Sequence, residues 1–429
     1  MKAAFITLGC KVNQYETQIL QEKFAAAGIE TAEKGERCDI CVINSCTVTS
    51  SGDKKTRQML RRLKRQNPDA VMVLTGCYAQ AFPQEAAALT EADVVTGTTN
   101  RSGVLDLVQA FLQTRQRIVQ IIPHERGETF EKMSATGFME RTRAFVKIQD
   151  GCDRYCTYCI IPYARGPVRS KTIEDMVEEL KQLAKQGYRE VVLVGINLPC
   201  YGKDLGLRLI DAVEAACAVE GISRVRLGSL EPELLTPPDL ARLAAQPKFC
   251  PQFHLSLQSG CDKTLKAMNR HYDSAEYARI VADIRAAFPN PSITTDIMTG
   301  FPGETEEDYQ QSEAFSVRMG FAKAHIFPYS VRQGTRAAKM PDQLTQKVKE
   351  ERAARLIAAT DETRRAFLQS QVGLVEEVLF ETTETPYGIE GYTANYTPVC
   401  VQTDEDIRGQ MRKVRITAAL NDQCLGELI

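Results

Sequence analysis

Short apolar runs alternate with helical patterns through the first part of the chain. Runs rich in β-branched and aliphatic residues predict strands at 3–8, 39–44, 71–75 and 93–96. Between them, apolar residues recur at helical spacing over 13–27, 53–66 and 83–89. Strands separated by helices form parallel sheets that helices cover on both faces. We therefore predict an open parallel α/β sheet domain over residues 1–122.

The alternation returns after residues 123–140, a polar stretch without a clear period that is predicted to be a linker. Helices are predicted at 173–186 and 344–369, and strands at 144–149, 190–194, 223–227, 252–257, 293–298 and 324–329. Elements in this order fit a (β/α) barrel, complete or partly open. We predict a partial (β/α)6 barrel over 141–369.

The last segment, residues 370–429, has no long helical period and is rich in β-branched residues, glycine and turn signals. This pattern is typical of a small β-barrel. We therefore expect an α/β protein of three domains, as a length of 429 residues suggests at about 150 residues per domain.

Composition excludes several classes of protein. With 43% hydrophobic and 25% charged residues, the chain is close to the globular average, which argues against disorder. Its apolar runs are far shorter than the roughly 20 residues that cross a bilayer, and its N-terminus has no signal-peptide pattern. We expect a cytoplasmic monomer without a membrane partner. A net charge of −2 neither requires nor excludes nucleic acid, because local patches matter more.

Cysteine usage points to metal or redox chemistry, since the chain has 14 cysteines and only 4 histidines. Cys152, Cys156 and Cys159 follow a predicted strand with Cys-x3-Cys-x2-Cys spacing. Such a loop can bind three corners of a [4Fe–4S] cluster and leave one iron open for a small molecule. Structural zinc is the alternative, but it usually needs four ligands, and only His124, across the linker, lies near.

A second set of cysteines shares a position in the predicted topology. Cys10, Cys46 and Cys77 each follow one of the first three strands. Successive strands of an open parallel sheet end at the same edge, so these thiols should converge and bind a second cluster. The alternative is that they are small buried core residues, as we expect for Cys38 and Cys41.

The triplet spacing, with Tyr158 before the third cysteine, resembles the radical S-adenosylmethionine (SAM) superfamily. The resemblance implies that Cys152, Cys156 and Cys159 hold a cluster whose open iron binds the methionyl amine and carboxylate of SAM. Reductive cleavage then yields methionine and a 5′-deoxyadenosyl radical, while the protein supplies orientation and excludes water.

From end to end, the chain resembles the radical SAM methylthiotransferases. Their plan is an N-terminal domain with an auxiliary [4Fe–4S] cluster, here on Cys10, Cys46 and Cys77, then a radical SAM barrel and a C-terminal TRAM domain. TLGCKVNQYET (7–17), INSCTVTSSGDKKTRQMLRR (43–62) and TGCYAQ (75–80) look most like the MtaB branch, which modifies N6-threonylcarbamoyladenosine beside the tRNA anticodon. The isopentenyladenosine branch tends to read GCQMN and GCMAQ, and the branch acting on a ribosomal protein tends to read GCPKN.

The resemblance also implies which residues surround SAM. They are Tyr158, Asn197, Ser256, Gln258, Asp296, Gly300 and Gly303. The usual Gly-Gly-Glu after the second barrel strand is absent, and Asn197 stands nearby as a hydrogen-bond acceptor for the methionyl amine. As alternatives, serine and glycine at these strand ends only turn the chain, and Glu304 only charges a helix N-terminus.

Basic residues supply the predicted RNA contacts. The helix over 53–66 has a stripe of them, which indicates a phosphate-binding surface or a solvated face. Arg165 and Arg169 are predicted to contact RNA phosphate or the SAM carboxylate, with a solvated loop charge as the alternative. The last domain is acidic, so its contact would depend on one face, with Arg412 and Arg415 beside Tyr392 and Tyr396. The full set is Lys54, Lys55, Arg57, Arg61, Arg62, Arg165, Arg169, Arg412 and Arg415.

The expected function is methylthiolation of C2 of N6-threonylcarbamoyladenosine at position 37 of tRNA, forming the 2-methylthio nucleoside. C2–H is unactivated, so a carbon radical has to break it. Two [4Fe–4S] clusters and SAM are the expected cofactors, and the expected partners are the tRNA anticodon stem-loop and a reduced flavodoxin or ferredoxin-type donor. The alternatives are the same chemistry on N6-isopentenyladenosine or a ribosomal protein side chain, and a non-catalytic RNA-binding protein with zinc.

Overall fold

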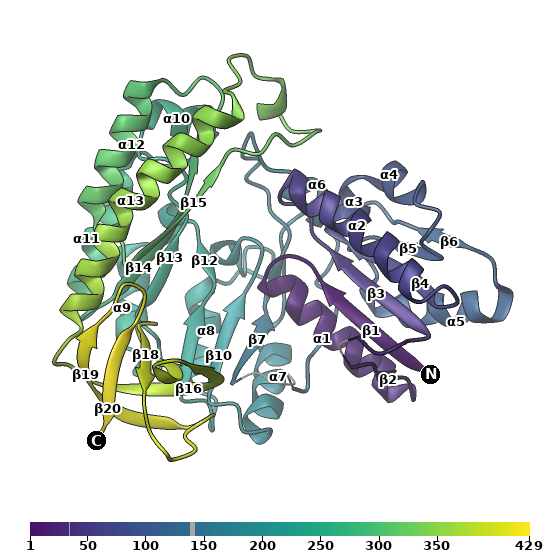
Figure 1. Ribbon diagram of the computed structural model, residues 1–429, viewed down its shortest axis with the longest axis horizontal. Helices are drawn as coiled ribbons and strands as arrows, with labels where there is room; N and C mark the ends of the chain where they lie inside the picture. The colour runs from purple at the N-terminus through teal and green to yellow at the C-terminus, as the bar shows by residue number, and fades with distance from the viewer. Residues whose placement is uncertain (34, 138–141) are drawn as a thin grey trace.

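The computed structural model describes residues 1–33, 35–137 and 142–429. The end of the predicted linker, residues 138–140, and the predicted first barrel residue, 141, lie outside the described residues. Figure 1 shows the N-terminal sheet beside the central strands, with the C-terminal strands below them.

The N-terminal sheet is parallel throughout, in the order β2-β1-β3-β4-β5-β6. Its strands are β1 (Lys2–Thr7), β2 (Glu30–Thr31), β3 (Ile40–Ser45), β4 (Val71–Gly76), β5 (Val94–Thr96) and β6 (Ile118–Gln120). Helices α1 (Lys11–Ala26) and α5 (Val104–Thr114) pack on one face, and α2 (Ser50–Gln66), α3 (Cys77–Ala81) and α4 (Pro83–Ala87) on the other. The predicted open sheet is confirmed. The edge strands β2 and β6 were not predicted, because two or three residues are too few to show a period.

The central strands form a barrel that is open at one side. They are β7 (Arg143–Lys147), β10 (Glu190–Val194), β11 (Arg224–Leu227), β12 (Ser229–Leu230), β13 (Gln252–Leu255), β14 (Ser292–Thr299) and β15 (Lys323–Pro328). They pair in parallel as β11-β10-β7 and β12-β13-β14-β15, and only Gly228 separates β11 from β12. The predicted partial (β/α)6 barrel is thus confirmed, with β7 and β15 as its free edges.

Helices and short elements complete this region. The helices are α6 (Ile161–Arg165), α7 (Ile173–Lys185), α8 (Leu209–Cys217), α9 (Pro237–Ala244), α10 (Asp262–Ala267), α11 (Ser274–Ala287), α12 (Glu306–Met319) and α13 (Gln346–Ser370). A small antiparallel pair, β8 (Gln149–Asp150) and β9 (Arg169–Ser170), flanks the cysteine loop. In the described chain, no helix is both long and apolar enough to span a membrane.

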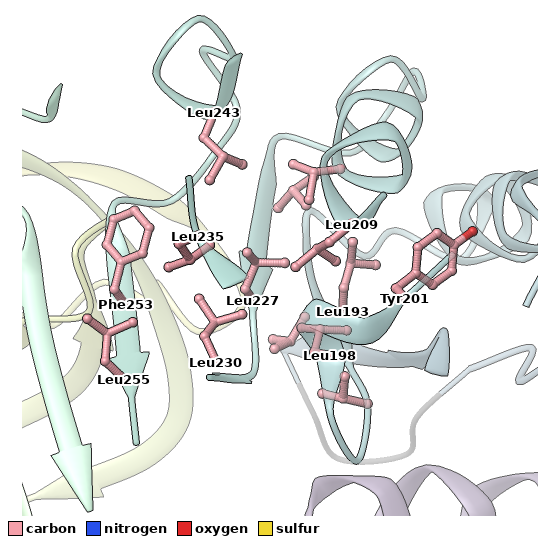
Figure 2. Close-up of a cluster of buried hydrophobic side chains, with 14 of the residues drawn as sticks. Leu193, Leu198, Tyr201, Leu209, Leu227, Leu230, Leu235, Leu243, Phe253 and Leu255 are labelled. Carbon is pink, nitrogen blue, oxygen red and sulfur yellow. The ribbon is translucent and has the colours of Figure 1, made fainter. Parts of the chain in front are cut away.

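Side-chain alternation gives the barrel an apolar outer face and a polar inner face. Figure 2 shows the outer face, where Leu227 and Phe253 lie with Leu209 and Leu243 of the covering helices. The strand register places the polar residues together on the other face, and they include Arg143, Lys147, Glu190, Arg224, Arg226, His254, Asp296 and His325. The interior can therefore accept a polar ligand.

The C-terminal strands close into a small barrel, as predicted. They are β16 (Val375–Thr385), β17 (Gly388–Tyr392), β18 (Pro398–Val401), β19 (Met411–Ala419) and β20 (Cys424–Leu428), in the order β16-β17-β18-β20-β19. This barrel packs against the amino ends of the central strands. Arg224 Nη1 donates to Tyr392 O at 3.0 Å, and Arg226 Nη1 donates to Ala394 O at 2.9 Å.

Glu190 should be a key residue of this junction. Its fully buried carboxylate lies 2.9 Å from Arg226 Nε and 3.6 Å from Arg224 Nη1. Breaking a buried ion pair from one side costs about 3–5 kcal/mol, because the other charge stays buried. Glu190→Gln should therefore lower the thermal unfolding midpoint by several degrees, measured by circular dichroism. Glu178→Gln, an exposed control on α7, should leave it unchanged. Equal midpoints would contradict this role.

Candidate functional site

The loop of Cys152, Cys156 and Cys159 follows β8 and is held in a fixed shape. Gly151 has φ 78°, and a Cβ there would lie 1.8 Å from Pro167 O, so only glycine fits. Cys152 N donates to Gly166 O at 3.0 Å, and Cys159 N donates to Cys156 O at 3.0 Å. The backbone thus curls so that the three thiols lie near one another.

The three thiols fit a cluster better than a single metal ion. Burial, with a smaller contribution from the neighbouring Cys156, raises the pKa of Cys152 to about 12. Crowded, buried thiols of this kind need a cationic group to become thiolates. Among the described residues, no three His, Cys, Asp or Glu side chains converge on one ion. A cubic cluster binds each thiolate through a different iron, so its ligands do not need to converge.

Two donors reach these sulfur atoms. Arg270 Nη1 lies 3.3 Å from Cys156 Sγ, and Asn197 Nδ2 lies 3.7 Å from Cys152 Sγ. Arg270 is also paired with Glu231, Nη1 to Oε1 at 3.1 Å. Sequence reasoning missed Arg270, because an isolated arginine between two helices has no diagnostic spacing.

Two predicted SAM residues have buried oxygens that need a donor. Within the described chain, Asn197 Oδ1 and Gln258 Oε1 are buried without a hydrogen-bond partner. Gln258 has φ 66°, and its backbone pairs with β14, where Gln258 N donates to Asp296 O at 2.8 Å. Unpaired buried acceptors are unfavourable unless a ligand supplies the donor. A ligand amine such as that of SAM therefore fits these residues.

The other predicted SAM residues divide into two groups. Tyr158 lies edge-on to Phe301 with ring centroids 6.4 Å apart, so the structure brings it next to Gly300. A Cβ on Gly303 would meet no atom within 4 Å, which leaves room for a ligand. Asp296 is instead 3.2 Å from His254 Nε2, and Ser256 O accepts a hydrogen bond from Arg270.

Glu304 and Gly300 have a structural explanation. A Cβ on Gly300 would lie 2.4 Å from Lys349 Cγ, so packing against α13 already requires this glycine. Glu304 accepts hydrogen bonds from Gly300 N at 2.9 Å and Arg352 Nη1 at 2.6 Å.

Cys10, Cys46 and Cys77 follow β1, β3 and β4 at one edge of the N-terminal sheet. A Cβ on Gly9 would lie 3.0 Å from Cys46 Sγ, so glycine lets the first loop approach the second. Burial raises the pKa of Cys77 to about 11, Arg165 opposes the rise, and Cys46 and Cys10 add to it. The three thiols therefore lie close enough to influence one another. Cys38 and Cys41 lie toward the opposite end of β3, with Sγ atoms 3.0 Å apart.

Arg165 joins the two cysteine triplets. It ends α6, which begins two residues after Cys159 and packs against α3, the helix that starts at Cys77. Its Nε donates to Cys77 Sγ at 3.1 Å, and Nη1 and Nη2 donate to Glu16 Oε1 at 2.5 Å and Asn13 Oδ1 at 2.8 Å. The side chain is 0% exposed. Arg165 is therefore not exposed for the predicted contact with RNA phosphate, and its predicted contact with the SAM carboxylate stays a prediction.

Further buried charges surround Arg165. Glu16 lies 2.8 Å from Lys147 Nζ and 3.2 Å from Arg101 Nε, and Asp150 lies 2.5 Å from Lys147 Nζ. Burial alone would raise the pKa of Glu16, but Arg101, Arg165 and Lys147 lower it to about 2. Arg165 thus lowers the pKa of Cys77, but burial raises it more, so this thiol needs the charge of a bound metal group to become a thiolate.

A second contact joins the N-terminal domain to the other edge of the barrel. Arg332, in the loop after β15, lies 2.7 Å from Asp53 Oδ2 and 2.7 Å from Thr47 Oγ1. At the first edge, Lys147 of β7 pairs with Glu16 of α1. The N-terminal domain therefore covers the open side of the barrel (Figure 1).

Comparison with known proteins places the chain in a family. The profile of the Radical SAM superfamily matches residues 146–315, and that of Uncharacterized protein family UPF0004 matches residues 2–97. A Bacillus subtilis protein named threonylcarbamoyladenosine tRNA methylthiotransferase MtaB is 39% identical over 97% of this chain and 94% of its own length. The chain belongs to the radical SAM methylthiotransferases.

Other relatives with similar coverage are also tRNA methylthiotransferases by name. The MtaB protein of Aquifex aeolicus is 40% identical over 87% of this chain and 91% of its own length. A tRNA-2-methylthio-N(6)-dimethylallyladenosine synthase of Pelotomaculum thermopropionicum is 34% identical over 97% of this chain and 95% of its own length. The predicted family and its MtaB branch are thereby confirmed.

Solved structures show the same fold. The radical SAM methyltransferase TsrM of Kitasatospora setae has a TM-score of 0.55 at 13% identity, over 76% of this chain and 74% of its own. The cobalamin-dependent radical enzyme OxsB has a TM-score of 0.51 at 12% identity, over 78% of this chain and 54% of its own.

The predicted RNA-binding residues of the methylthiotransferase are not equally accessible. Lys54, Lys55, Arg61 and Arg62 are exposed on α2, although Arg61 Nε donates to Glu91 at 3.0 Å. Arg57 is half-buried, and its Nη1 donates to Tyr78 at 3.2 Å. That the basic stripe on α2 binds RNA phosphates remains a prediction.

The remaining predictions for RNA need correction. Arg169 is 5% exposed and lies 2.9 Å from Glu128 Oε2, so it cannot bind a surface phosphate. Arg412 pairs with Glu405 at 3.1 Å, and Arg415, three residues along β19, is on the opposite face of the strand. The predicted common face of these two arginines is therefore wrong.

The tyrosines predicted beside them are engaged internally. Tyr392 and Tyr396 stack with centroids 4.5 Å apart, and the Arg143 guanidinium lies 4.8 Å from the first ring. Both rings are half-buried and pack against arginines of the central barrel.

Arg165→Gln should loosen the contact between the two triplets. It removes the donor to Cys77 and leaves Glu16 short of one cation, at a cost of about 3–5 kcal/mol. Arg165→Lys keeps the positive charge but not the planar guanidinium, so this variant should lose less stability than Arg165→Gln. The measurement is the thermal unfolding midpoint under anaerobic conditions, with exposed Arg279→Gln on α11 as control. Identical midpoints for Arg165→Gln and the control would refute this.

Proposed function

We propose that this chain inserts a methylthio group at C2 of N6-threonylcarbamoyladenosine at position 37 of tRNA. The observation that supports it best is the pair of cysteine triplets joined through Arg165, since both clusters must reach one base. The MtaB relatives, which are named for this nucleoside, extend over nearly the whole chain. The proposed domains are 1–122, 141–369 and 370–429, with 123–140 as linker.

In this proposal, Cys152, Cys156 and Cys159 hold the radical-generating [4Fe–4S] cluster. With SAM bound, that cluster supplies the carbon radical that removes the hydrogen from C2. Arg270 and Asn197 donate to its sulfur ligands. The SAM contacts are Tyr158, Asn197, Ser256, Gln258, Asp296, Gly300 and Gly303.

A second [4Fe–4S] cluster is proposed on Cys10, Cys46 and Cys77 as the site that holds the sulfur to be transferred. The contact of Arg165 with Cys77 supports it, because the guanidinium donates to Cys77 Sγ and offsets part of the cost of a buried thiolate. Arg165 positions this second site against the first.

The proposed partners are the tRNA anticodon stem-loop and a reduced flavodoxin or ferredoxin-type donor, for a cytoplasmic monomer. The α2 stripe of Lys54, Lys55, Arg57, Arg61 and Arg62 is the proposed phosphate contact, with exposed Arg415 on the C-terminal barrel.

Iron content tests the two clusters. Anaerobically reconstituted protein should contain about eight irons per chain, four for each cluster. Replacing Cys10, Cys46 and Cys77 with alanine should lower this to about four and leave SAM cleavage intact. Cys38→Ala, in the same domain, is the matched control and should keep about eight. Unchanged iron in the triple variant would show that the second cluster is misplaced.

Nucleoside analysis tests the substrate. Digested tRNA from cells that lack the gene should accumulate N6-threonylcarbamoyladenosine, and its 2-methylthio form should return with the wild-type gene, measured by mass spectrometry. The Cys152→Ala variant should not restore it. Loss of 2-methylthio-N6-isopentenyladenosine instead would favour the alternative substrate, for which relatives at 33–34% identity are named.

A further inference from the structure

Lys11 has an unusual position. It follows Cys10 and begins α1, and its side chain is exposed. Yet its ammonium lies 6.0 Å from the centroid of the Phe145 ring. Phe145 belongs to β7, on the same face as Arg143 and Lys147, which is the inner face of the barrel. The exposed Lys11 ammonium therefore lies beside Cys10 and next to a residue of this inner face.

The nearby inner-face charges are balanced without Lys11. Arg226 Nε pairs with Glu190 at 2.9 Å, Arg143 Nη2 with Glu381 at 2.5 Å, and Arg224 Nη2 with Glu377 at 3.6 Å. Each guanidinium therefore has its own carboxylate.

Lys11 itself has no such partner. In the described part of the chain, no hydrogen bond or ion pair involves its ammonium. An ammonium without an ionic partner beside the inner face of the barrel favours an anionic ligand.

The proposed nucleoside has a matching anion. Its threonylcarbamoyl group ends in a carboxylate, whereas an isopentenyl group has no charge. C2 and C6, which bears N6, flank N1 on the same edge of adenine. A residue next to a ligand of the sulfur-holding site is therefore well placed to meet the N6 substituent when C2 faces that site.

We propose that Lys11 binds the carboxylate of the threonylcarbamoyl side chain and thereby selects this nucleoside over uncharged ones. The inference rests on the proposed function and adds the residue that determines its specificity. The motif GCQMN of the isopentenyladenosine branch has glutamine at this position, which makes Lys11→Gln the natural test.

The experiment measures binding to anticodon stem-loops by fluorescence anisotropy under anaerobic conditions, with reconstituted enzyme. Three loops are compared, with N6-threonylcarbamoyladenosine, N6-isopentenyladenosine or plain adenosine at position 37. Wild type should prefer the first loop. Lys11→Gln should reduce that preference roughly ten- to hundredfold, as expected for a lost charge-assisted hydrogen bond, and leave binding of plain adenosine unchanged.

Two further variants separate charge pairing from other effects. Lys11→Arg keeps the charge and should retain most of the preference. Lys185→Gln removes an equal charge from the exposed end of α7 and should behave as wild type. Iron content and thermal midpoint of Lys11→Gln should equal those of wild type, which excludes a folding defect.

The outcomes are distinct. A preference that survives in Lys11→Gln overturns the inference and leaves the proposed function standing. Equal weakening for all three loops assigns Lys11 to a phosphate and also overturns it. If wild type shows no preference and does not convert the threonylcarbamoyl loop, the proposed function fails as well.

Discussion

The arrangement of the site depends on the buried guanidinium of Arg165. It donates to a thiol, a carboxylate and an amide oxygen that all belong to the N-terminal domain, while its own helix follows the barrel's cysteine loop. A planar guanidinium can satisfy three acceptors at once and keeps its charge at any ordinary pH. The two domains therefore cannot separate without leaving buried charges unpaired, which is strongly unfavourable. One side chain thus fixes the spacing of the two candidate clusters.

Charge is distributed differently near the cysteines and at the amino ends of the barrel strands. Near the cysteines, Arg101, Arg165 and Lys147 surround Glu16 and lower its pKa, and Arg165 also donates to Cys77. At the amino ends of the strands, arginines and glutamates are matched and join the barrel to the C-terminal domain. Lys11, next to Cys10, has no ion-pair partner among the described residues, so its ammonium is available to an anionic ligand.

Sequence reasoning succeeded where local pattern decides structure. Helix and strand periods located the sheet, the barrel and the small C-terminal barrel, and Cys10, Cys46 and Cys77 converge because parallel strands end at one edge. It failed for basic residues. Arg165 and Arg169 were interpreted as surface charges and are buried, and Tyr392 and Tyr396, predicted to stack on bases, stack on each other beside Arg143. No local pattern in the sequence indicated a role for Arg270, because its partners Cys156 and Glu231 come from distant segments of the chain.

The sequence by itself determined the elements, the two thiol triplets and the family, since these depend on periodicity and on spacing within a few residues. Only the tertiary structure decided which charges are buried and which remain free. Arg165 and Cys77 are 88 positions apart, and Arg165 and Glu16 are 149 positions apart. Whether an arginine faces solvent or a thiol follows from how distant segments pack, and that information is absent from any local stretch of the chain.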